Sequence, residues 1–485
     1  DVRPGSIIEY QYVIHTQDVE WLKPWYFQEE IPVLHSEVRV DNFREVTYAA
    51  FPQMYEVEPY RQGRYRMRHI KALEKGDFTG NWNDYRAGLR FQMEEFFSLR
   101  TEAEEWRLIN MDLQQGTLFL DDSATQDALY SLTQSLTRDA ITDEEKVSIL
   151  YNHVRKNVRW NQKSDTWMTK TPSRTYKDQE GNSVEINMLL TQMLWLANLD
   201  AYRLFYRTRE KGLPSFYPIR NQFNDMMCIV EVDGQTFLLD ATDPLRPYDL
   251  IPKRALNRMG WMIKDSTASW VKIPQRYSAS LSAYSLMSIH ADGNIHGECK
   301  ETHTGYQALE MKKKYKDRGN QFHLDSDSSI FKKFILKEIK GITEPDLPVT
   351  ISYNLESNHF SQKNGDTLKI APLLHYKEGF NPFQPVSRSY PVDFGYIWEK
   401  TILLNFLIPE GYQVAKIPEN IRVKTMDEKV MYEFVCTYSG RTIQLRNILK
   451  VQKAVIEPED YPAIRNIYQQ MIGKQGEKII LIPSP

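Results

Sequence analysis

Hydrophobic and polar residues alternate along both ends of the chain and give way to helical spacing between them. Alternation with period two at 6–14, and again at 38–40 and 45–50, predicts strands separated by turn residues. Residues 1–122 are therefore interpreted as an N-terminal β-sandwich domain, incomplete at its start.

Helical spacing begins at residue 123. Leu129, Leu132 and Leu136 fall on one face of a predicted helix. Thr142 and Glu145 match a capping box, which predicts the start of a second helix at this point. These features indicate that a domain containing helices follows the sandwich.

A central helix and a small sheet are predicted next. The stretch 181–197 is apolar nearly all round, as expected for a helix buried on every side. The two-residue turn Asp233-Gly234 joins two of the following strands as a hairpin. The three predicted strands are 201–208, 226–232 and 235–240. A mixed α+β domain is thus expected over 123–272.

Alternation returns beyond Trp270 and continues toward the C-terminus. A hairpin around Asp292-Gly293 is expected to open a β-rich domain over 273–390. Three more strands and a closing helix at 457–472 predict a C-terminal β-sandwich domain over 391–485. These three strands occupy 402–408, 430–436 and 442–451.

Composition excludes some classes of protein. Lys and Arg total 61 against 64 Asp and Glu, so the chain lacks the basic excess that sequence-independent nucleic-acid binding needs. No stretch approaches the ~20 consecutive apolar residues of a membrane-spanning helix. Cys228, Cys299 and Cys436 lie in strand-like runs, and we expect buried free thiols.

The predicted hairpin brings two aspartates together. Its two-residue turn sets Val232 opposite Gln235. In that register Asp225 is the diagonal, same-face neighbour of Asp240. We expect both side chains to face the start of the central helix, where Ser183 lies. A serine there is either an N-cap or a nucleophile beside the positive end of the helix dipole.

This arrangement resembles the transglutaminase-like family, in which Gly-Asp-Cys at a helix start is followed by a His and then by Leu-Asp-Ala-Thr. The present chain has Gly181-Asn182-Ser183, then Phe223-Asn224-Asp225, then 239–244, which reads Leu-Asp-Ala-Thr-Asp-Pro. Only the third segment keeps the active pattern. The resemblance implies a papain-related core whose Cys and His positions hold Ser183 and Asp225, with Asp240 as the third member.

Over essentially its whole length, the chain is similar to a bacterial multidomain subfamily in which this core is flanked by β domains of unknown function. The resemblance implies an exported protein of a Gram-negative bacterium, periplasmic or surface-attached, of a kind labelled transglutaminase-like or "putative protease". It is carried by the segments Pro4-Gly5-Ser6, Tyr26-Phe27-Gln28, Ile31-Pro32-Val33, 181–187, 240–244, 391–395 and 458–462.

The altered triad leads to two hypotheses of function. A serine needs a base with a pKa near neutrality, and Asp225 at a reference pKa of ~3.9 is too weak a base at pH ~7. The first hypothesis is therefore a non-catalytic binding or scaffolding protein, a pseudoenzyme without metal or other cofactor. Its ligand would be an unknown protein, peptide or glycan.

The second hypothesis is a peptidase or acyl-transferase that uses Ser183 with carboxylate assistance. Asp225 and Asp240 could share a proton in acid, and Glu185 is another candidate base. The indole of Trp160 is a candidate oxyanion donor. Asn182 and Asn224 flank the triad positions as auxiliary candidates, and His153 is the remaining candidate base.

A third hypothesis is a carbohydrate or cell-wall binding module. Exposed aromatic rings would then act as stacking platforms for sugars. The candidate rings are Trp21, Trp25, Trp82 and Tyr85.

Overall fold

The computed structural model describes most of the chain. The described residues are 22–40, 47–55, 57, 59–61, 63–94, 101–118, 123–248, 250–264, 267–274, 277–321 and 330–485. The strand predicted at 6–14, the start of the one at 45–50, and Trp21 lie outside these residues. The chain divides into two compact units, of which the first takes residues 1–75, 82–106 and 215–220 and the second the rest.

The first unit contains two three-stranded sheets around one hydrophobic core. The sheets have the orders β1-β6-β3 and β2-β5-β4. The core comprises Phe27, Val57, Ile70, Ala87, Leu89 and Phe91. The strands are β1 (Trp25–Tyr26), β2 (Val33–Arg39), β3 (Thr47–Gln53), β4 (Pro59–Arg61), β5 (Arg64–Ile70) and β6 (Gly88–Glu94).

Aromatic residues of this unit take part in its packing. Tyr85 is only 7% exposed. Trp25 is half-buried and its Nε1 donates to the Ser36 hydroxyl at 3.2 Å. The guanidinium of Arg86 lies 4.6 Å from the ring centroid of Trp82. These three rings do not form the exposed platform that the carbohydrate hypothesis requires.

The predicted α+β domain begins the second unit and has a five-stranded antiparallel sheet of order β11-β10-β9-β12-β13. Its strands are β9 (Asp200–Tyr206), β10 (Asp225–Val232), β11 (Gln235–Leu239), β12 (Met259–Lys264) and β13 (Thr267–Lys272). Two short strands, β7 (Arg159–Trp160) and β8 (Glu180–Gly181), pair in parallel beside it. The helices are α2 (Ser123–Thr137), α3 (Asp143–Asn157), α4 (Pro172–Asp178) and α5 (Ser183–Leu196), and α1 (Glu102–Gln115) precedes them along the chain.

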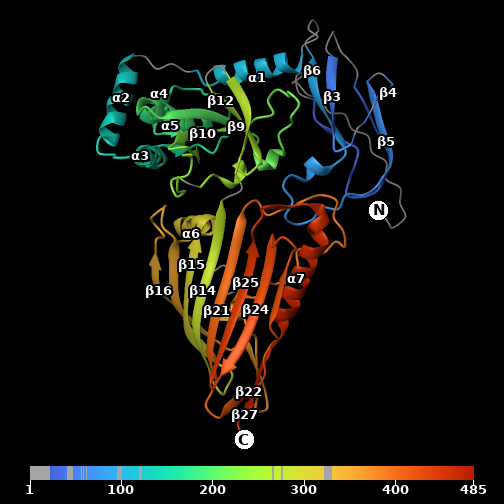
Figure 1. Cartoon of the computed structure of the whole chain (residues 1–485), viewed down its shortest axis with the longest axis vertical. Helices are drawn as coiled ribbons and strands as arrows, with labels where there is room; N and C mark the ends of the chain where they lie inside the picture. The colour runs from blue at the N-terminus through green and yellow to red at the C-terminus, as the bar shows by residue number, and fades with distance from the viewer. Residues whose placement is uncertain are drawn as a thin grey trace, which may run out of the picture. The chain divides into compact units, whose positions relative to one another are not determined.

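The helix predictions for this domain are confirmed. Thr142 and Glu145 form the expected capping box at the start of α3. In α5, eleven of the fourteen residues are buried, as expected for a helix apolar on nearly every side. Figure 1 shows α5 beside β10, with α2 and α3 at the edge of the domain.

The β10–β11 hairpin has the predicted register, with Val232 opposite Gln235. Asp233 and Gly234 both have positive φ, 50° and 75°, as a type I′ turn requires. Strand β10 is buried on both faces except at Glu231. Cys228, Val230 and Val232 belong to the core shared with α5, whereas residues of opposite parity, Met227 and Ile229, belong to the core on the other face.

The rest of the second unit is built on one eight-stranded sheet of order β16-β17-β15-β14-β21-β25-β24-β23 (Figure 1). Its strands are β14 (Ser278–Ile289), β15 (Ile295–Thr304), β16 (Lys333–Lys340), β17 (Val349–Ser357), β21 (Ile397–Leu407), β23 (Ile421–Lys424), β24 (Val430–Ser439) and β25 (Thr442–Val451). A four-stranded sheet contains β18 (Ser361–Asn364), β19 (Thr367–Ile370), β27 (Ile479–Pro483) and β22 (Tyr412–Lys416). A further pair is β20 (Val392–Asp393) with β26 (Val455–Ile456).

The predicted boundary at 390/391 crosses this large sheet. β14 lies before the boundary and pairs in parallel with β21, which lies after it. One hydrophobic core contains residues from both sides, from Ala283 to Leu481. The two stretches predicted as separate domains therefore share a sheet and a core.

Two helices accompany this sheet, α6 (Gly305–Arg318) and α7 (Tyr461–Gly476). The predicted closing helix is confirmed as α7, whose Tyr461, Ile464 and Ile467 are buried. No helix among the described residues is long and apolar enough to cross a membrane.

Candidate functional site

Ser183 begins α5 and has no exposed surface. The N-cap is the preceding residue, Asn182, whose side-chain oxygen accepts from the Glu185 N–H at 2.9 Å. The Glu185 carboxylate accepts from the Asn182 N–H at 2.9 Å, which completes a capping box. The prediction that Ser183 could be the N-cap is thus wrong by one residue. Asn182 takes that position because it forms the capping box with Glu185.

The Ser183 hydroxyl is hydrogen-bonded to a loop and, in the described part of the chain, not to a base. Its Oγ accepts a hydrogen bond from the Asp165 N–H at 3.1 Å. The Ser183 N–H donates to the carbonyl oxygen of Lys163 at 3.0 Å. Within the described residues no carboxylate or imidazole is hydrogen-bonded to this serine. The side chain therefore ties the loop at 163–165 to the start of α5.

Glu185 is 1% exposed and both of its oxygens are engaged. One completes the capping box with Asn182. The other, Oε1, accepts from the N–H of Thr169 at 2.9 Å and from its hydroxyl at 2.6 Å. The candidate base Glu185 is thus hydrogen-bonded to the backbone N–H groups of Thr169 and Asn182.

The two aspartates lie together, as predicted. Asp225 and Asp240 are 0% and 1% exposed. They follow the parity of Met227, whose side of the sheet is opposite the one packed against α5. Asp225 is nevertheless linked to the start of α5, because its Oδ2 accepts from the hydroxyl of Ser164, and the next residue, Asp165, donates its N–H to Ser183 Oγ.

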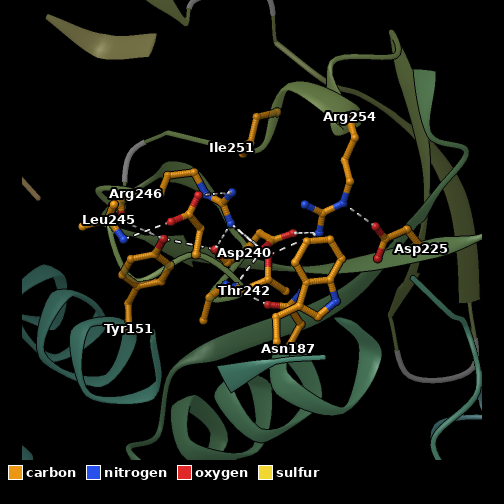
Figure 2. Close-up of polar contacts among 12 residues, drawn as sticks. Tyr151, Asn187, Asp225, Asp240, Thr242, Leu245, Arg246, Ile251 and Arg254 are labelled. Carbon is orange, nitrogen blue, oxygen red and sulfur yellow. Dashed lines mark hydrogen bonds and ion pairs between the residues drawn. The ribbon is translucent and has the colours of Figure 1, made fainter. Parts of the chain in front are cut away.

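A guanidinium lies between the two carboxylates (Figure 2). Arg254, on the short helix Lys253–Ala255, donates from Nε to Asp225 Oδ2 at 2.8 Å and from Nη2 to Asp240 Oδ2 at 2.9 Å. The ring of Trp160 lies 4.6 Å from the guanidinium carbon. The second hypothesis expected these aspartates to share a proton, and the intervening cation removes the repulsion that such sharing needs.

Asp225 has further donors. Its Oδ2 also accepts from the Tyr206 hydroxyl at 2.8 Å and from the Ser164 hydroxyl at 3.1 Å. Its Oδ1 accepts from the Met226 N–H at 2.8 Å. Both oxygens of the Asp225 carboxylate therefore accept hydrogen bonds.

Asp240 is held by a second arginine. Arg246 donates from Nη2 to Asp240 Oδ1 at 2.5 Å, and the Thr242 N–H donates to the same oxygen at 3.0 Å. Burial alone would raise the pKa of Asp240, but the guanidiniums of Arg254 and Arg246 and the Thr242 hydrogen bonds outweigh it, and the pKa is lowered. The carboxylate is thus a weak base that stays ionised at neutral pH.

Sequence reasoning missed the residues that hold this site. Arg246 and Arg254 come six and fourteen residues after Asp240. Two buried carboxylates without a histidine nearby require a cationic partner. This requirement could have pointed to an arginine beside them. Asn187 was also missed. On α5, it donates to the Met226 carbonyl at 2.9 Å and accepts from the Ala241 N–H at 2.9 Å, which fixes both strands (Figure 2).

The auxiliary candidates have structural partners. The Trp160 Nε1 donates to the Lys163 carbonyl at 2.9 Å, so it does not serve as a free oxyanion donor. The Asn224 side chain accepts from the Thr208 N–H at 2.9 Å and shapes a turn. His153 Nε2 lies 2.9 Å from the Tyr176 hydroxyl and is engaged there.

The thiols are also poor nucleophiles. Cys228, Cys299 and Cys436 are free and buried, as predicted. Burial raises the pKa of Cys228 and of Cys299 to about 12, and that of Cys436 to about 11. Within the described residues, no group of three His, Cys, Asp or Glu side chains is arranged to hold a metal ion.

Two family models match parts of the chain. Residues 130–214 match the model of the Transglutaminase-like superfamily. Residues 366–481 match DUF3858, a domain of unknown function with a solved structure. The protein is therefore a multidomain protein with a transglutaminase-like core and a DUF3858 domain. The second match extends across residue 390, as does the large sheet. No curated protein sequence matches the chain.

One solved structure shows a similar fold over most of this chain. The crystal structure of a "putative protease" from Parabacteroides distasonis aligns over 95% of this chain and 74% of its own, with 12% identity and a TM-score of 0.53. A "putative cysteine protease" from Cytophaga hutchinsonii aligns over 52% of this chain and 84% of its own, with 12% identity and a TM-score of 0.22. At such identity the first likeness concerns the fold, and the second carries no argument.

Proposed function

We propose that this protein is a non-catalytic transglutaminase-like protein, which binds or organises a ligand and does not cleave or transfer acyl groups. The observation that carries the proposal is the Arg254 guanidinium, bonded to both Asp225 and Asp240. Both carboxylates already accept hydrogen bonds from this fixed cation, and neither is hydrogen-bonded to Ser183 in the described part of the chain.

The surroundings of Ser183 support the same proposal. Acyl transfer needs a nucleophile that a base can deprotonate and that a substrate carbonyl can approach. Here the hydroxyl oxygen is fully buried and accepts from the backbone N–H of Asp165. The candidate bases Glu185 and His153 are bonded to other groups.

A turnover assay tests the proposal. Wild-type protein and the Ser183→Ala variant would be incubated with a mixed peptide and amide library from about pH 3 to 8, the range in which a carboxylate base would act. We expect no turnover that depends on Ser183. Ser135→Ala, on the exposed face of α2, is the matched control for preparation and folding.

Two outcomes would overturn the proposal. Turnover by wild-type and Ser135→Ala protein, lost in Ser183→Ala protein whose unfolding midpoint is unchanged, would establish a serine enzyme. Turnover present equally in all three proteins would be followed through size-exclusion chromatography. Activity that co-elutes with the protein would also overturn the proposal, whereas activity that separates from it would belong to a contaminant and leave the proposal standing.

We further propose that the protein works outside the cytoplasm, in the periplasm or at the surface of a Gram-negative bacterium. The resemblance to an exported bacterial subfamily supports this location. Cell fractionation with an antibody against the protein tests it, and recovery in the cytoplasmic fraction alone would refute it.

A further inference from the structure

A groove runs beside the altered triad on the second unit. One cavity of about 730 Å³ and another of about 740 Å³ meet along shared walls. The residues lining both are Trp160, Gln162, Thr242, Pro244 and Lys316. Each cavity alone has the size of a small-ligand site, so the joined groove has room for an extended chain.

The groove walls are positively charged, although the whole chain has a net charge of −3. Eight lining residues are cationic and four are acidic. The cations are Arg155, Lys156, Arg159, Arg246, Lys253, Arg254, Lys313 and Lys316. The acids are Glu180, Asp243, Glu310 and Asp317. Adding the acids that pair with these cations from outside the lining, Asp225, Asp240 and Asp346, leaves eight against seven, so a small positive excess remains.

Several of the cationic groups have unused capacity to donate. Lys156 and Lys316 are exposed, and neither forms an ion pair in the described part of the chain. The Nε of Arg246, a residue 2% exposed, is buried and has no acceptor. Of the Arg254 nitrogens, Nε and Nη2 bind the aspartates, whereas Nη1 donates to no described residue.

The rigidity of the wall favours recognition. Arg254 is fixed by two carboxylates and by the ring of Trp160. A guanidinium held in place loses little side-chain entropy when it donates to a further oxygen. Pro244 and Trp160 add apolar surface at the junction of the cavities, against which a peptide backbone can pack.

We propose that this groove binds an extended acidic peptide, whose carboxylates meet Lys156, Lys316 and the free edge of Arg254. The inference rests on the proposed function and adds the class of ligand to it. Because the groove ions lie near the surface, binding should weaken as salt rises.

Fluorescence polarisation with a defined probe tests the inference. The probe is a fluorescein-labelled octapeptide of alternating Glu and Ala, compared with its Gln counterpart. We expect tighter binding of the Glu peptide. The double variant Lys156→Gln/Lys316→Gln should weaken it about 2- to 30-fold, since each exposed charge pair contributes ~0.2–1 kcal/mol.

Matched controls make the outcomes distinct. Lys300→Gln/Lys337→Gln removes two exposed lysines outside the groove and should leave affinity unchanged. Equal binding of the Glu and Gln peptides, or equal loss in both double variants, would overturn the inference. Equal binding of a single-stranded oligonucleotide would also overturn it, because the site would then select charge alone.

The same samples separate this inference from the proposed function. Cleavage of the labelled peptide by wild-type but not Ser183→Ala protein would refute the non-catalytic function while retaining the acidic-peptide ligand. If the labelled peptide is neither cleaved nor selectively bound, the acidic-peptide inference is refuted and the proposed non-catalytic function is not.

Discussion

Two buried carboxylate clusters in the second unit are stabilised by different chemistry. In the arginine cluster, Asp225 and Asp240 are bonded by Arg254 and Arg246. In the Glu301 cluster, on β15, the carboxylate of Glu301 is bonded mainly by neutral or titratable donors. These are the hydroxyls of Tyr353 at 2.6 Å and Tyr376 at 2.9 Å and the Nε2 of His303 at 3.1 Å.

The difference shows two ways to compensate a buried negative charge. A guanidinium cancels the charge, whereas hydroxyl and imidazole groups solvate it. Burial by itself would raise the pKa of Glu301, but hydrogen bonds from His303, His375 and Tyr353 outweigh it and hold the pKa well below its usual range. Removing one hydrogen-bond partner should therefore lower the free energy of unfolding more in the arginine cluster, because there the change removes a full positive charge.

The largest effect is expected for Arg254→Met. The variant leaves Asp225 without a cationic partner and Asp240 with only Arg246, so we expect a loss of ~3–5 kcal/mol in the free energy of unfolding. Urea denaturation at pH 7 measures it. Lys253→Met is the adjacent control, because its pair with the exposed Glu310 should contribute no more than ~1 kcal/mol. Equal losses in the two variants would contradict the assigned role of Arg254.

An intermediate effect is expected for Glu301→Gln. The change removes the charged acceptor of three donors, so we expect a loss of about 3 kcal/mol at pH 7. Since the folded-state pKa of Glu301 is lowered, its stabilisation is complete above the unfolded value of ~4.3 and declines as pH falls below it.

Urea denaturation of wild-type and Glu301→Gln protein at pH 7 and at about pH 3 measures this dependence. The difference between the two proteins should shrink at the lower pH. A difference that stays constant would mean that the ionised carboxylate is not the stabilising species.

The two clusters also differ in how far the sequence predicts them. The turn Asp233-Gly234 fixes the register of the hairpin, so the proximity of Asp225 and Asp240 followed from local chemistry. Their cationic partners did not follow, because these come from other elements. Arg254 reaches both carboxylates from the short helix Lys253–Ala255, a tertiary contact with no local pattern.

The Glu301 cluster gives no sequence signal at all. Its residues come from β15, β17 and the short helix Leu374–Tyr376, and each looks like an ordinary strand or loop residue. The shared eight-stranded sheet escaped prediction for the same reason. The parallel pairing of β14 with β21 joins segments far apart in the chain, and alternation within each strand does not specify its neighbours.

The smallest effects should come from removing one phenol from each cluster. Tyr353→Phe removes a donor to Glu301, and we expect a loss of about 1.5 kcal/mol, because no guanidinium remains to compensate. Tyr206→Phe removes a donor to Asp225, which keeps Arg254 and Ser164, so we expect only ~0.5–1 kcal/mol. Both changes delete one buried hydroxyl. The difference between their unfolding free energies therefore compares a carboxylate held by neutral donors with one held by a guanidinium. A larger loss for Tyr206→Phe would mean that the guanidinium does not dominate the stabilisation of Asp225.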